Sequence, residues 1–174
     1  MSIGIYDYAS VPPDLLARAE GAVGQLYGTI GMRTRWSEKY HDQNIVFDAP
    51  LTIRVDQPDL ALIILDARMT SVWAPPKDAL GCAPGTRVER GRIAYMFYDR
   101  LKRLAVTADR TVDLMSLVIA HEIGHLLLPY GSHSDSGVMR ADWSVNDPQD
   151  LAVQHLAFTS SQIQQIHHRL GIDP

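Results

Sequence analysis

Cysteine is almost absent from this sequence, because Cys82 is the one cysteine among 174 residues. A single cysteine excludes an intramolecular disulfide, and it excludes a zinc site built from several thiolates. Long apolar runs are absent as well. The longest, such as LALIIL and LVIA, fall far short of the roughly 20 residues that a membrane-spanning helix needs. The sequence therefore predicts no membrane partner.

Positive charge is scarce. Lys and Arg number 16 against 20 Asp and Glu, which gives a formal net charge of −4. Because a nucleic-acid-binding surface usually needs a basic face, this balance argues against a nucleic-acid partner. Hydrophobic residues make up 46% of the chain, and its length suits one domain with its own core. We expect a single domain over residues 1–174, most simply a monomer. The first residues, MSIGIYDY, show no signal peptide, which leaves the compartment open.

The hydrophobic periodicity, together with the positions of glycine, proline and capping residues, predicts both strands and helices. The chain opens as strand, helix, strand, which is typical of an α/β unit. The second helix is expected to be capped by Asp109 or Thr111 and ended by Pro129. The expected strands are 3–9, 32–36, 44–47, 51–55, 60–67, 79–83 (a short edge strand) and 92–99, and the expected helices are about 13–30, 107–128 and 159–171.

The stretch HEIGH, residues 121–125, lies near the end of the second predicted helix. Residues four apart on a helix are offset by about 40° around its axis, so His121 and His125 project from one face and can bind one ion. Zinc accepts neutral imidazole. Glu122 follows beside the metal, where it can take a proton from a bound water. With seven His and four Glu in the chain, about 0.006 chance matches are expected, which disfavours a coincidental helix face.

A catalytic zinc ion usually has three protein ligands and one open position. No glutamate follows Glu122, which excludes a downstream glutamate as the third ligand. The near candidates are His133, Asp135 and Asp142. A proline and a glycine before His133 can stop the helix and turn the chain back under the metal, so His133 is the predicted third ligand. The two carboxylates remain alternatives.

Together these residues resemble the metzincin clan of zinc peptidases. That clan has His-Glu-x-x-His on a helix, a glycine turn, a third histidine and a methionine-bearing turn. The matching residues here are His121, Glu122, His125, His133 and Met139. The order of the predicted elements is also similar to that of the clan, and the resemblance spans most of the chain. The third histidine comes two residues later than the usual spacing.

The resemblance implies an α+β fold with an α/β-like N-terminal part, a twisted mixed sheet, an active-site helix, a methionine turn and a C-terminal helix. It divides the chain into an upper subdomain, about residues 1–128, and a lower subdomain, about residues 129–174. It further implies a zinc-dependent endopeptidase with one catalytic zinc ion, in which Glu122 is the general base toward a zinc-bound water. A peptide or protein substrate would lie along the edge strand by strand addition, and Arg140 to Trp143 would wall a specificity pocket.

Two other classes remain as alternatives. A non-catalytic, zinc-stabilised binding module would have no use for Glu122, and a closed tetrahedral site would lack a fourth His or Cys ligand. A zinc ribonuclease with three histidines carries a small residue where this chain has Glu122, and the acidic balance fits it poorly. Both alternatives are weaker than the peptidase.

Overall fold

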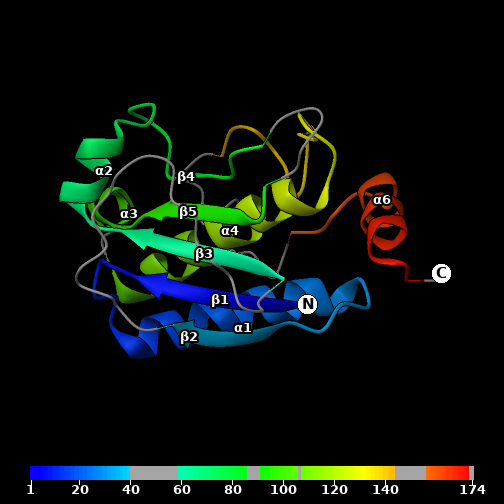
Figure 1. Ribbon diagram of the computed structural model, residues 1–174, viewed down its shortest axis with the longest axis horizontal. Helices are drawn as coiled ribbons and strands as arrows, with labels where there is room; N and C mark the ends of the chain where they lie inside the picture. Colours follow the sequence, from blue (N-terminus) through cyan, green and yellow to red (C-terminus); the bar gives the residue numbers. More distant parts are fainter. Residues whose placement is uncertain (40–58, 86–90, 106, 144–155, 173–174) are drawn as a thin grey trace.

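The computed structural model describes residues 1–39, 59–85, 91–105, 107–143 and 156–172. These residues contain a five-stranded sheet with the order β2-β1-β3-β5-β4 (Figure 1). Four strands run parallel, and β4 pairs antiparallel with β5 at one edge. The α+β prediction with a mixed sheet is confirmed. The strands are β1 (Ser2–Asp7), β2 (Arg35–Lys39), β3 (Leu60–Leu65), β4 (Gly81–Cys82) and β5 (Ile93–Phe97).

The strand β3 lies in the middle of this sheet, between β1 and β5. All six of its side chains are buried, which explains why its sequence, LALIIL, is a continuous apolar run without alternation. A parallel strand that is covered on both faces has no polar side to show to solvent. The predicted strands 44–47 and 51–55 lie outside the described residues.

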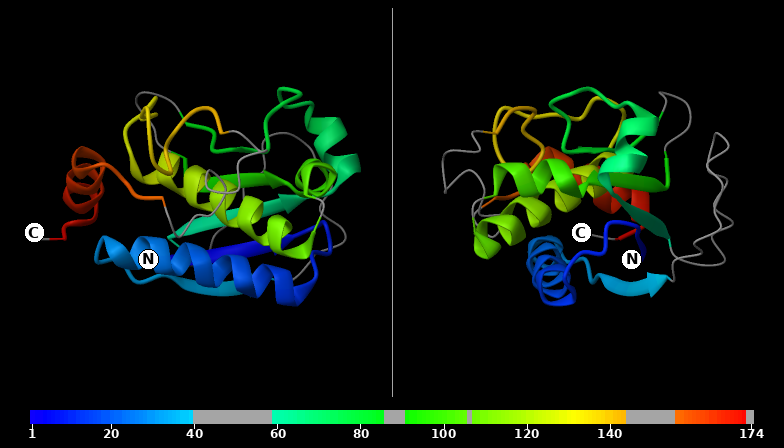
Figure 2. Two further views of the ribbon diagram at one scale, coloured as in Figure 1. Left: turned by 180° about the vertical axis from the view of Figure 1, so that it is seen from behind. Right: turned by 90° about the vertical axis from the view of Figure 1, so that its left-hand side faces the viewer.

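Two long helices cover one face of the sheet (Figure 2). They pack against each other, and the buried Tyr27 of the first donates its hydroxyl hydrogen to the carbonyl oxygen of Ala120 in the other, at 2.9 Å. This bond ties the second helix to the core one residue before His121. The helices are α1 (Pro13–Thr29), α2 (Ala67–Trp73), α3 (Tyr98–Leu104), α4 (Ala108–Leu127) and α6 (Ser160–Leu170).

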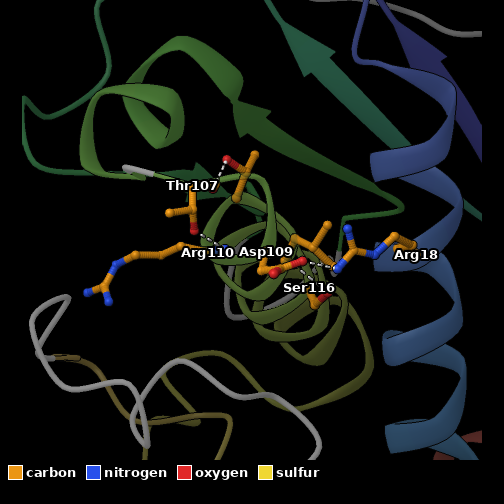
Figure 3. A network of polar contacts seen from close by, with 7 residues as sticks. Arg18, Thr107, Asp109, Arg110 and Ser116 are labelled. Carbon is orange, nitrogen blue, oxygen red and sulfur yellow. Dashed lines mark hydrogen bonds and ion pairs between the residues drawn. The ribbon is translucent and has the colours of Figure 1, made fainter.

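The start of α4 differs from the prediction. The cap is Thr107, whose extended backbone precedes the helix and whose hydroxyl oxygen accepts from the backbone N–H of Arg110. Asp109 instead pairs with Arg18 on α1 at 2.5 Å (Figure 3). The hydroxyl of Thr111 donates to the Thr107 carbonyl. The predicted caps were wrong because both residues already lie inside the helix.

Other boundaries also differ. The strand predicted at 32–36 begins at Arg35, because the residues after α1 first close the helix with a bond from the Met32 N–H to the Tyr27 carbonyl. The short helices α2 and α3 were not predicted, since seven residues are too few to show a helical period. The strand predicted at 92–99 ends at Phe97, where α3 begins.

The end of the chain follows the prediction closely. Helix α4 ends at Leu127, just before Pro129. Helix α6 begins with a capping box between Thr159 and Gln162 and ends at Leu170, followed by its cap Gly171, whose φ of 63° is left-handed. Within the described ranges, no helix is both long and apolar enough to cross a bilayer. The division into subdomains near residue 128 stays a prediction.

Candidate metal centre

Three imidazoles converge near the C-terminal end of α4. His121 and His125 lie on one face of α4, and His133 comes from the loop that follows it. One nitrogen of each ring lies within 4.8 Å of the others, and the two Nε2 atoms on α4 are 2.9 Å apart. Nitrogen ligands of a tetrahedral zinc ion are about 3.3 Å apart when each Zn–N bond is about 2.0–2.1 Å. The three side chains therefore fit a zinc ion with small adjustments.

The ring of His121 is oriented by the backbone. Its Nδ1 lies 2.9 Å from the carbonyl oxygen of Val138, so a proton on Nδ1 is donated to that oxygen. This tautomer leaves the lone pair of Nε2 directed at the other imidazoles, which is the usual arrangement of a histidine that binds a metal. The indole ring of Trp143 packs edge-on against the same imidazole, with ring centres 4.6 Å apart.

The protonation states of these histidines also suit a cation. Burial, together with the neighbouring His125, lowers the pKa of His121 to about 3. Burial likewise lowers the pKa of His125 to about 4, with His133 adding to the effect. Both imidazoles are therefore neutral at pH 7, and the neutral form is the one that binds metal ions.

The loop that carries His133 is held from two sides. The backbone N–H of Ser134 donates to the carbonyl of Met139 at 3.0 Å, which closes the turn. On the other side, the amide nitrogen of Gln162 on α6 donates to the Ser132 carbonyl and to the Ser134 hydroxyl, each at 3.2 Å. Gln162 thus bonds to both neighbours of His133. Sequence reasoning missed this role; the signal that could have drawn attention to Gln162 is its place three residues after Thr159, as in a capping box.

A buried methionine follows in the same loop. Met139 is fully buried, and its sulfur lies so close to Gly124 that a Cβ there would be 2.3 Å away. It therefore packs directly on the helix segment between the two histidines of α4. Gly137 has a φ of 75°, and a Cβ there would lie 2.1 Å from the Ala157 carbonyl oxygen, so the turn needs glycine. The assignment of this turn, which carries Met139, as a metzincin methionine turn stays a prediction.

Of the predicted third ligands, the structure brings one to the other two histidines. His133 is in the group, and neither Asp135 nor Asp142 is. This concerns the described residues, in which the three histidines are the group suited to hold a metal ion. The identity of the third ligand remains a prediction until a metal titration tests it.

Glu122 lies between two cavities. Its side chain is buried, and burial raises the pKa of its carboxyl group to about 8. One cavity, of about 490 Å³, reaches past the three histidines. The other, of about 380 Å³, is walled by Ala141, Asp142 and Trp143, in the segment predicted to form a pocket. Because Gly81, His121 and Glu122 line both cavities, the hollow continues along β4 on either side of the carboxyl group.

Comparison with known proteins agrees with this fold. No protein-family model and no curated protein matches the sequence. The structure is similar to the crystal structure of archaemetzincin from Methanopyrus kandleri, with a TM-score of 0.63 and 15% sequence identity. The alignment covers 98% of this chain and 96% of that one. At this identity the likeness shows a shared fold. The protein thus has a metzincin-like α+β fold, with a three-histidine group that can hold a metal ion.

Proposed function

We propose that this protein is a zinc-dependent endopeptidase. The observation that carries the proposal is the convergence of three imidazoles with the Glu122 carboxyl group in one cleft beside the sheet edge. Three histidines leave a coordination position open, as in catalytic zinc sites, whereas structural sites are closed by four protein ligands. The metzincin-like fold supports the same conclusion.

His121, His125 and His133 would hold the ion, and each has a nitrogen available for it. A zinc ion bound there supplies a Lewis acid that polarises the scissile carbonyl and lowers the pKa of water. The carbonyl of Val138 keeps the proton of His121 on Nδ1, away from the ion. The burial of His121 and the partial burial of His125 keep competing protons off their ring nitrogens at neutral pH.

Glu122 is the proposed general base. Burial holds a proton on its carboxyl group near neutral pH, but a nearby cation favours the charged form and so restores the carboxylate. The carboxylate accepts a proton from the attacking water and then donates it to the leaving amine nitrogen. Its position next to His121, in the wall shared by the two cavities, places it within the proposed reaction site.

The proposed substrate is an extended peptide that pairs with β4. Among the strands that the structure describes, β4 is at the edge of the sheet, where the outer backbone groups of a strand can bond to another strand. A peptide in that position runs past Glu122. Its side chains on the two sides of the scissile bond then enter the two cavities.

The test combines metal analysis with hydrolysis. Purified protein should contain one zinc ion per chain and cleave casein or gelatin. A chelator should abolish cleavage, and added zinc should restore it. The matched variant is Glu122→Gln, which should keep the zinc and lose most of the activity. A zinc-loaded protein that cleaves neither substrate would instead be a binding module, and RNA cleavage that survives Glu122→Gln would indicate a ribonuclease.

A further inference from the structure

The edge strand approaches Glu122 more closely than a side chain would allow. A Cβ atom at Gly81 would lie 2.7 Å from both Cγ and Oε1 of Glu122, and 2.8 Å from Cγ1 of Val118. Nonbonded carbon atoms normally lie about 3.5–4.0 Å apart. Any residue other than glycine at position 81 would therefore force a shift of about 1 Å in this contact.

The flexible partner in this contact is the Glu122 side chain. The strand is held by its pairing with Met96 and by a bond from the Phe97 N–H to the Leu80 carbonyl at 2.9 Å. Val118 is buried on α4 and, being β-branched, has one preferred rotamer in a helix. Neither strand nor helix moves easily, so a side chain at position 81 would push the carboxyl group.

No hydrogen bond to another described residue holds that carboxyl group. The adjacent His121, for example, directs its Nδ1 to the carbonyl oxygen of Val138 and not to Glu122. The position of the Glu122 carboxyl group is thus set by the atoms packed around it, and Gly81 forms the wall on the strand side.

We propose that Gly81 is a positioning residue, whose missing side chain provides the space that keeps the Glu122 carboxyl group beside the three-histidine site. Its role in hydrolysis rests on the proposed function, but its effect on packing does not. The same absence of a side chain keeps the cleft open, because Gly81 lines both cavities.

The kinetic test is Gly81→Ala. Because a misplacement of about 1 Å can cost about 10²-fold in rate, kcat should fall by about 10–100-fold, with zinc content unchanged and KM little changed. Against a Glu122→Gln background the same substitution should have almost no further effect on kcat, since the displaced base is already absent. Unchanged kcat, or a rise in KM alone, would overturn the proposal, because the methyl group would then merely obstruct the substrate.

A second readout does not depend on hydrolysis. In the metal-free protein, Gly81→Ala should lower Tm by about 2–10 °C through overpacking. In a Glu122→Ala background the loss should be at most half as large, because Cγ and Oε1 are gone and Val118 alone remains in conflict. Equal losses in the two backgrounds would overturn the proposal. If the loss in Tm is smaller in the Glu122→Ala background but the protein hydrolyses no substrate, the proposed function would be overturned and the packing role of Gly81 supported.

The matched control is Gly28→Ala on α1, where a Cβ would meet nothing within 4 Å. It should leave kcat unchanged, and its effect on Tm should be the same with and without Glu122→Ala. If Gly81→Ala does not fold, the double variant with Glu122→Ala decides. A folded double variant supports the proposal, and an unfolded one overturns it, because the conflict would then lie with the strand or Val118.

Discussion

Gln162 should contribute to metal affinity although it belongs to the C-terminal helix. Its side chain is buried, and its amide nitrogen bonds to the backbone of Ser132 and the hydroxyl of Ser134, on both sides of His133. Its amide oxygen separately accepts from the Thr159 N–H at the helix cap. Replacing Gln162 therefore tests whether the loop is prearranged for the metal.

The magnitude follows from the two bonds to the loop. A hydrogen bond contributes a net free energy of about 0.5–1.5 kcal/mol, so losing both would destabilise the ordered loop by about 1–3 kcal/mol. If metal binding must restore that order, the Kd for zinc rises by about 5–150-fold, in the range of about 10–100-fold known for residues that support metal ligands. Gln162→Glu should show this loss while keeping the acceptor for the cap.

The assay is a competition titration with a chromogenic zinc chelator, together with thermal unfolding. Gln162→Ala loses the cap acceptor as well, so it should lower Tm more than Gln162→Glu does. The control is Gln165→Ala, which removes an exposed amide-to-hydroxyl bond on the same helix, to Ser161. Zinc affinity in Gln162→Glu equal to that of Gln165→Ala would refute the reasoning.

Three further outcomes are expected. His121→Ala and His125→Ala should each abolish stoichiometric zinc in elemental analysis, since each removes one of the two adjoining proposed ligands on α4. In a metal titration, His133→Ala should weaken zinc by orders of magnitude, whereas Asp135→Ala should lose at most about 10–100-fold; the reverse ranking would make Asp135 the ligand. Without metal, the free energy of unfolding should fall between about pH 6.5 and pH 8, because folded Glu122, with a pKa of about 8, keeps a proton that the unfolded carboxyl, near 4.5, has released; below about pH 6.5 the lowered pKa values of His121 and His125 act in the opposite direction. Urea titrations of Glu122→Gln should lack that component of the fall.

The sequence by itself determined the part of the site that lies on one helix. The spacing of His121 and His125 places both imidazoles on one face for any α-helix, and Glu122 follows by the same geometry. The C-terminal helix was equally predictable, because its cap at Thr159 and its exit at Gly171 act within a few residues. The buried strand β3 showed itself as an apolar run.

Tertiary structure decided what depends on contacts distant in the chain. The spacing alone left His133 and Asp135 equal in reach, and the folded loop, held by Gln162 from α6, brings His133 to the other histidines. At the start of α4 the cap is Thr107, while Asp109, one of the predicted caps, makes a tertiary contact with Arg18 of α1. The contact between Gly81 and Glu122 could not be predicted from the sequence, because the two residues are 41 positions apart. Only the packing of β4 on α4 brings them within van der Waals distance.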